Sequence, residues 1–141
     1  MKKLVLDAWA FLALLQAEEP AASQVKRLLG KAQRQQLVLF VSVINLGEVY
    51  YRVGRLKGES EAQKTLDDIR RLSLMVVSAT DGRVFAAAGF KMRYAVSFAD
   101  AFAAAAAAEL KAVLVSGDPE LGALQSEIRL QKLVRDKKQS M

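Results

Sequence analysis

Short apolar runs alternate with longer segments of helical periodicity along this chain, and that alternation restricts the folds open to it. The runs are rich in Val and Leu, as is typical of strands buried on both faces of a sheet. Strands that alternate with helices predict an α/β fold with three layers, in which a central, mostly parallel sheet of four or five strands carries helices on both faces. The predicted strands cover residues 3–7, 36–41, 74–77 and 112–115, with a last edge strand at 128–133.

The segments between these strands carry the start and stop signals of helices. Ser42, Thr80 and Ser97 are suited to cap helices, and Pro20 separates the first helix from the second. The alanine-rich stretch from Ala99 to Ala108 favours a helix that packs closely, because alanine is the best helix former and has a small side chain. The predicted helices cover residues 8–16, 21–33, 43–55, 59–72, 81–94 and 98–110, with a short one at 119–124.

The length of 141 residues fits one domain with a core that needs no cross-links. We assign residues 1–133 to this domain and residues 134–141 to a polar, frayed tail. The basic side chains around this tail are read as solubilising; they are Lys132, Arg135, Lys137 and Lys138.

Cysteine and histidine are both absent from the sequence. Their absence excludes disulfides, zinc-thiolate sites, thiol catalysis and every mechanism that needs a histidine within one chain. A hydrolytic site built by this chain must therefore use carboxylates, Lys, Tyr, Ser or a metal ion.

The formal net charge is +6, which favours a polyanionic partner such as a nucleic acid or a membrane surface. No apolar run reaches the roughly 18 residues of a membrane-spanning helix. We therefore expect a cytoplasmic protein without membrane attachment.

Four acidic residues stand where an open parallel sheet places its functional site. Asp7 ends the first apolar run and Asp118 follows the fourth, so both belong at the carboxyl edge of the sheet. Glu48 lies on the helix after the second strand, and Asp100 lies in the first turn of the helix at 98–110. Carboxylates that converged there would repel one another unless a cation lay between them.

Each carboxylate also has an ordinary structural explanation. The two aspartates that follow strands can cap the next helix. Asp100 forms a Ser-x-x-Asp pattern with Ser97 that is similar to a capping box, and Glu48 can pair with Arg52 one turn later. Position alone leaves capping and metal binding open as alternatives for these residues.

The four carboxylates occur in short motifs whose order along the chain is more informative than any one of them. These motifs are Val5-Leu6-Asp7-Ala8, Asn45-Leu46-Gly47-Glu48-Val49, Ser97-Phe98-Ala99-Asp100-Ala101 and Leu114-Val115-Ser116-Gly117-Asp118-Pro119-Glu120. In this order they resemble the PIN-domain nucleases, specifically the VapC-type toxins of toxin–antitoxin pairs. The resemblance runs from Leu4 to about Leu121, and its departures, such as Trp9, lie outside the acidic set.

The resemblance implies a PIN-like fold and an endoribonuclease that depends on Mg²⁺ or Mn²⁺ and hydrolyses RNA with a metal-activated water. It assigns the catalytic and metal-binding roles to Asp7, Glu48, Asp100 and Asp118. Asn45 and Ser116 match positions that the family often fills near the site, so they are second-tier candidates. A metal-dependent hydrolysis needs no histidine. It implies products with 5′-phosphate and 3′-hydroxyl ends.

The same resemblance implies partners. A type II toxin has a cognate antitoxin protein, and we expect a homodimer, for which surplus apolar positions at Ala13, Leu14 and Val25 offer an interface. The RNA substrate needs cations near the acidic site. The RNA-binding candidates are Arg52, Arg55, Lys91 and Arg93.

Two other functions are compatible with the sequence. The chain can be a non-catalytic basic module that binds RNA or a partner, or a PIN nuclease of RNA processing without a toxin role. An aspartate phosphotransferase of the haloacid-dehalogenase type is disfavoured, because it needs a second Asp where Trp9 stands.

Overall fold

A computed structural model describes residues 1–136 of the chain. The described elements match the predicted ones in type and order. The strands are β1 (Lys3–Leu6), β2 (Val38–Ser42), β3 (Met75–Val77), β4 (Val113–Ser116) and β5 (Arg129–Lys132). The helices are α1 (Ala8–Leu15), α2 (Ala21–Gln33), α3 (Val43–Lys57), α4 (Glu59–Arg70), α5 (Asp81–Arg93), α6 (Phe98–Leu110) and the 3₁₀ helix η1 (Pro119–Leu124).

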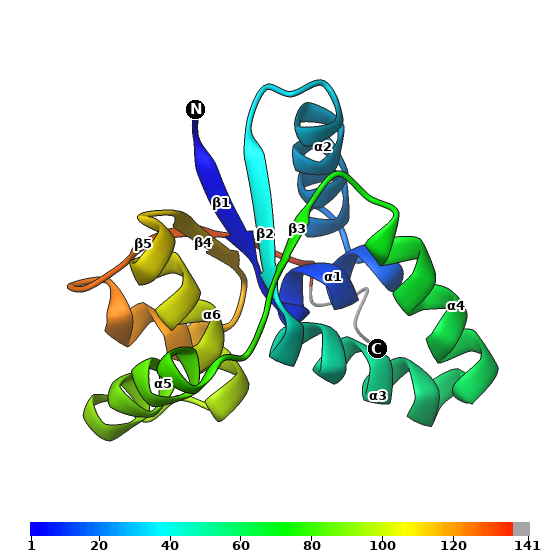
Figure 1. The fold of residues 1–141 in the computed structure, drawn as a ribbon. Helices are drawn as coiled ribbons and strands as arrows, with labels where there is room; N and C mark the ends of the chain where they lie inside the picture. The colour runs from blue at the N-terminus through cyan, green and yellow to red at the C-terminus, as the bar shows by residue number, and fades with distance from the viewer. Residues whose placement is uncertain (137–141) are drawn as a thin grey trace.

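All five strands lie in one sheet of order β3-β2-β1-β4-β5 (Figure 1). Every neighbouring pair is parallel, with Leu4 opposite both Leu39 and Val113 in the centre. The predicted α/β class and the parallel sheet are confirmed, and the edge strand β5 also pairs in parallel. Parallel neighbours place their carboxyl ends at the same edge of the sheet, so the segments after β2, β1 and β4 meet there.

Helices cover both faces of the sheet and divide the core into two layers (Figure 1). Leu4 and Leu6 of β1 pack with helices α1 to α4, whereas Val5 between them packs on the other face with α5 and α6. This alternation follows from the period of two in a strand. Helix α6 is buried along most of its length, because its alanines let it approach the sheet closely. The three-layer fold is therefore confirmed.

Helix boundaries follow the predicted capping residues. The side chains of Ser42, Thr80 and Ser97 each accept a hydrogen bond from a backbone amide in the first turn of α3, α5 and α6. Helix α3 continues two residues beyond its predicted end at Arg55. It stops at Gly58, whose φ of 94° lies in the region that favours glycine.

The structure bears on two expectations, the dimer interface and the C-terminal tail. Ala13 and Val25 are fully buried in the core of the protomer and so cannot form the homodimer interface expected of them. Of the expected tail, residues 137–141, including Lys137 and Lys138, lie outside the described part of the chain. Arg135 forms an antiparallel bridge with Pro20. None of the helices within residues 1–136 is both long enough and apolar enough to cross a membrane.

Candidate metal centre

Three adjacent strand ends and one helix start bring the four predicted carboxylates to one side of the molecule. Asp7 directly follows β1, Asp118 follows β4, and α3 rises from the end of β2 with Glu48 in its second turn. Helix α6 packs against α3 and carries Asp100 in its first turn. Glu48, Asp100 and Asp118 line one small cleft, which we call the acidic cleft. The remaining lining residues are Ala8, Trp9, Leu12, Gln16, Arg52 and Arg135.

Asp7 is a helix cap with one oxygen left over. Its Oδ1 accepts a hydrogen bond of 3.0 Å from the Ala10 amide, as expected of an N-cap residue. Its Oδ2 is buried and has no hydrogen bond of good geometry among residues 1–136, although the Ser116 hydroxyl lies near enough to favour the charged carboxylate. A buried carboxylate oxygen without a partner is unfavourable, so this atom is suited to be a ligand of a cation. Capping and metal binding are thus compatible roles for Asp7.

Asp118 is also a helix cap, whereas the Asp100 carboxylate is not. Ser97 caps the amide of Asp100, but the amide of Ser97 is contacted by Glu120 Oε2 at 3.4 Å. The Asp100 carboxylate is therefore not used in a reciprocal capping box, and its buried Oδ2 has no donor within the described residues. Asp118 caps η1 through Oδ1, which accepts from the Glu120 amide at 3.0 Å.

Glu48 is held beside the cleft by two features of α3. Its carboxylate lies 3.4 Å from Arg52 Nε, so the predicted i,i+4 pair is present. The Glu48 side chain is partly buried, unlike that of an acid on a solvent-facing helix surface. Asn45, one turn earlier, is fully buried and donates from Nδ2 to the Ala99 carbonyl of α6 at 3.1 Å. Asn45 therefore fixes the helix of Glu48 against the helix of Asp100.

Burial and mutual repulsion raise the proton affinity of the cluster. Burial raises the pKa of Asp7 to about 7, and the charges of Asp118 and Glu48 add to this, while the nearby Ser116 hydroxyl and the Ala10 amide act in the opposite direction. The pKa of Asp100 is also raised, first by burial and then by the adjacent Asp118 side chain. Ser116 also accepts from the Asp118 amide at 3.0 Å.

The residues fit a hard divalent cation. One carboxylate oxygen each from Asp100, Asp118 and Glu120 lie within 4.8 Å of one another. These three oxygens form an all-oxygen donor set, which Mg²⁺ and Mn²⁺ prefer. Among residues 1–136 the close group includes neither Glu48, which lines the same cleft, nor Asp7, whose charge interacts with Asp118 and Glu48. Glu120 was not among the predicted ligands, since an exposed acid after Pro119 has no periodic signal to mark it.

The predicted RNA-binding cations are placed unequally. Arg52 lines the acidic cleft, while Arg55 lies over the Tyr51 ring at 5.1 Å on the exposed side of α3. Lys91 donates to the Val96 carbonyl at 2.9 Å, and Arg93 pairs with Glu127 at 3.0 Å. The structure thus brings Arg52 to the cleft but engages Lys91 and Arg93 in local contacts. Arg135, which the sequence suggested only as a tail residue, lines the cleft instead.

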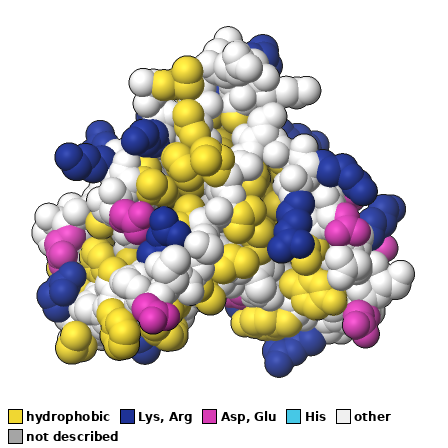
Figure 2. Space-filling view, in the orientation of Figure 1, with side chains coloured by type: hydrophobic (Ala, Val, Ile, Leu, Met, Phe, Trp, Pro, Cys, Tyr) yellow, Lys and Arg dark blue, Asp and Glu magenta, His cyan; other side chains and the backbone are white. Residues whose placement is uncertain are grey.

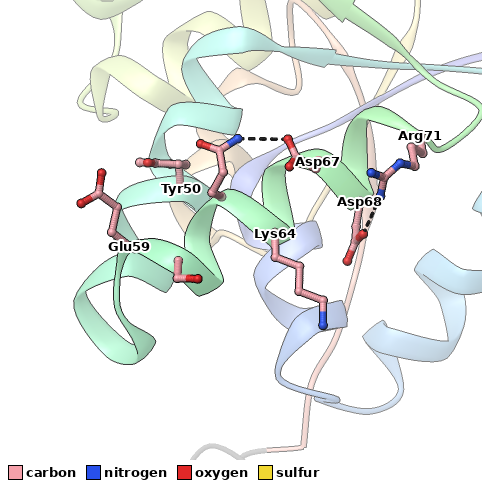
Figure 3. Close-up of a pocket in the computed structure, with 8 residues that line it drawn as sticks. Tyr50, Glu59, Lys64, Asp67, Asp68 and Arg71 are labelled. Carbon is pink, nitrogen blue, oxygen red and sulfur yellow. Dashed lines mark hydrogen bonds and ion pairs between the residues drawn. The ribbon is translucent and has the colours of Figure 1, made fainter.

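A second, more open pocket lies between α3 and α4 and shares no lining residue with the acidic cleft (Figure 3). Two side-chain contacts run along α4, where Asp67 accepts from Gln63 and Arg71 pairs with Asp68. Figure 3 shows Glu59 and Lys64 pointing in different directions rather than toward one centre. We regard this pocket as a solvated helix surface. It is lined by Tyr50, Glu59, Ser60, Gln63, Lys64, Asp67, Asp68 and Arg71.

The chain is similar to known proteins over the segment that holds the four predicted carboxylates. The sequence model of the PIN domain matches residues 4–126. Among solved structures, VapBC2 from Rickettsia felis bound to a DNA fragment from its promoter has a TM-score of 0.72 at 16% identity, over 94% of this chain and 99% of that one. The sarcin–ricin loop cleaving toxin VapC20 of Mycobacterium tuberculosis has a TM-score of 0.69 at 20% identity, over 86% and 94% of the two chains.

A toxin–antitoxin complex from Klebsiella pneumoniae has a TM-score of 0.68 at 11% identity, over 94% of this chain and 99% of that chain. At such identities the similarity is one of fold. No curated protein sequence matches this chain.

Proposed function

Because this chain belongs to the PIN domain family, we propose that it is a Mg²⁺- or Mn²⁺-dependent endoribonuclease, the toxin of a type II toxin–antitoxin system. The observation that carries the proposal is the acidic cleft, where three of the four motif carboxylates face one cavity and the fourth lies close enough to interact with them electrostatically. The PIN domain match covers the segment that holds all four.

The chain's own residues have distinct tasks in this proposal. Asp100 and Asp118, with Glu120 beside them, would hold the ion together with Asp7 and Glu48. A bound ion would supply an activated water and offset negative charge at phosphorus. Asp7 and Asp118 use one oxygen to cap a helix, so the backbone orients each carboxylate. Ser116 orients the Asp118 loop, and Asn45 orients Glu48 relative to Asp100.

The raised pKa values of Asp7 and Asp100 make metal binding depend on pH. A carboxylate must lose its proton to act as a ligand, so the ion competes with protons at Asp7 and Asp100. Occupation of the site therefore rises with pH through the neutral range. It also relieves the repulsion that the folded chain builds into the cleft.

The proposal includes partners and setting. An antitoxin partner is supported by the similarity to toxin–antitoxin complexes, and RNA as the substrate by the net charge of +6 and by Arg52 in the cleft. We further propose a homodimer, a cytoplasmic protein and one folding unit over residues 1–133. Phe85 and Met92 on α5 are largely exposed, which supports self-association.

A direct test compares digestion of matched single-stranded RNA and DNA by the purified protein. We expect RNA cleavage that needs Mn²⁺ or Mg²⁺ and is lost in excess EDTA. Asp118→Asn retains the cap of η1 but weakens the ion site, so cleavage should fall by about two orders of magnitude or more. Asp67→Asn, on the solvated face of α4, is the matched control and should cleave normally.

Three results would each contradict a part of the proposal. Cleavage that persists in EDTA or in Asp118→Asn would exclude the acidic site. Unimpaired RNA binding by the wild type without cleavage under any metal condition would favour a non-catalytic basic module instead. Activity on RNA without growth inhibition in cells would favour an RNA-processing nuclease.

A further inference from the structure

Arg135 reaches the acidic cleft from a distant part of the sequence. It follows β5, whereas the other residues of the cleft come from the segments after β1, β2 and β4 and from α6. The guanidinium lies 5.2 Å from the centre of the Trp9 ring, which is itself a wall of the cleft. Its side chain is 43% exposed, so it is both anchored and open to solvent.

The anchor of Arg135 is buried and specific. Glu18 is 4% exposed, and its two carboxylate oxygens accept from Arg135 Nη1 at 3.1 and 3.3 Å. The backbone of Arg135 bridges to Pro20, and the Asp136 amide donates to the Glu19 carbonyl at 2.7 Å. A surface arginine that served only solubility would need none of these contacts. The guanidinium is therefore held in a defined place.

Trp9 connects this anchor to the metal-binding loop. A Cβ on Gly117 would come within 2.2 Å of the Trp9 ring, so the indole lies directly against the backbone beside Asp118. The order Arg135, Trp9, Gly117 is thus a continuous stack that ends at a proposed ion ligand. It fixes the cation relative to the acidic centre.

The charge distribution of the cleft gives this cation a role. Carboxylates repel an RNA backbone, so its phosphates need cations at the cleft wall. Arg52, the other arginine of the wall, is paired with Glu48. A guanidinium has five donors in a planar fork. Within residues 1–136, Arg135 bonds to Glu18 through Nη1 alone. The rest of the fork suits a phosphate oxygen.

We propose that Arg135 is a phosphate-binding residue that contacts the RNA backbone beside the bond to be cut. The inference rests on the proposed nuclease function. Arg135 lies outside the four acidic motifs. In this proposal Glu18 and Trp9 both hold its guanidinium at the edge of the acidic cleft.

The test measures binding of a short fluorescein-labelled single-stranded RNA at several salt concentrations in an Asp7→Asn background, which prevents cleavage. The double variant Glu18→Gln/Arg135→Gln removes both charges and so avoids an unpaired buried carboxylate. Loss of one phosphate contact should weaken binding about tenfold at low salt and reduce the slope of log K against log salt by about 0.7. Arg71→Gln, which removes a cation from the α4 surface, is the control and should leave the slope unchanged.

The outcomes separate the two proposals. An unchanged slope in the folded double variant, equal to that of Arg71→Gln, overturns the role of Arg135 even if the wild type cleaves RNA. A reduced slope with a wild type that never cleaves RNA supports Arg135 and refutes the nuclease. If the double variant does not fold, Arg135→Lys replaces it, because lysine keeps a charge near Glu18 but lacks the planar fork. A KM for RNA that is severalfold higher at unchanged kcat supports the proposal. An unchanged KM for RNA overturns it.

Discussion

Asp7 combines two roles through its two carboxylate oxygens. Oδ1 caps α1, and Oδ2 is buried with no hydrogen bond of good geometry among the described residues. Sequence position left these roles as alternatives, because a strand-end aspartate serves either purpose equally well. Only the three-dimensional surroundings separate the oxygens. The assignment of Asp7 as an ion ligand stays a prediction that its proton affinity makes testable.

The pKa of Asp7 predicts how the metal-free protein responds to pH. Burial raises that pKa to about 7, against about 3.9 in an unfolded chain, so the folded state binds more protons between these values. Its contribution to stability is full below about pH 4 and is lost as the pH rises to about 7. Asp7→Asn keeps the cap and never ionises. In EDTA at pH 8 it should be more stable than the wild type by on the order of 3 kcal/mol, as measured by urea unfolding.

Near pH 4 the two proteins should unfold at similar urea concentrations. Mn²⁺ should stabilise the wild type more at pH 8 than at pH 6, and the variant much less at either pH. A variant that is less stable than the wild type at pH 8 would show that the Asp7 charge is not costly.

Gly117 is required by the position of Trp9. A methyl group there would overlap the indole. Gly117→Ala should therefore destabilise the protein by about 1–3 kcal/mol and displace Asp118, lowering Mn²⁺ affinity. Calorimetric titration and urea unfolding check both effects. Trp9→Ala should rescue the Gly117→Ala variant in part. Gly47→Ala, whose Cβ would meet nothing within 4 Å, is the control and should be neutral or slightly stabilising.

At the scale of elements, the contact between α3 and α6 determines how Glu48 faces Asp100. Asn45→Ala removes its bond to the Ala99 carbonyl, which joins the two helices, and truncates a fully buried side chain. It should cost about 1–3 kcal/mol and reduce RNA cleavage. Gln63→Ala removes an exposed hydrogen bond of similar length and should cost clearly less, because water replaces the lost partner. Equal losses in urea unfolding for the two variants would contradict this role of Asn45.

The elements themselves could be predicted because their signals are local. Ser42, Thr80 and Ser97 mark helix starts through a hydrogen bond that spans two or three residues, and Gly58 marks a helix end. The meeting of the strand ends follows from parallel pairing. The Glu18–Arg135 pair depends on residues 117 apart in sequence, so no local pattern could indicate it. The ion pair of Arg93 with Glu127 was missed for the same reason.

At the scale of the whole molecule, an apolar surface supports self-association. Phe85 and Met92 are both largely exposed, two turns apart on α5, and hydrophobic side chains are visible over this helix in Figure 2. Phe85→Glu/Met92→Glu should convert the expected dimer to a monomer in light scattering. Leu56→Glu, on α3, is the exposed apolar control. A wild type that is monomeric at high concentration would contradict the expected homodimer.

The proposed metal centre hydrolyses RNA without histidine, and the chemistry of the product ends distinguishes this mechanism from attack by the ribose hydroxyl. Purified protein should cut RNA in Mn²⁺ to leave 5′-phosphate and 3′-hydroxyl ends, because water rather than the ribose hydroxyl is the nucleophile. Asp7→Asn and excess EDTA should each abolish these ends. Products with 2′,3′-cyclic phosphates, or equal cleavage by Asp7→Asn, would contradict the assignment of the acidic cleft.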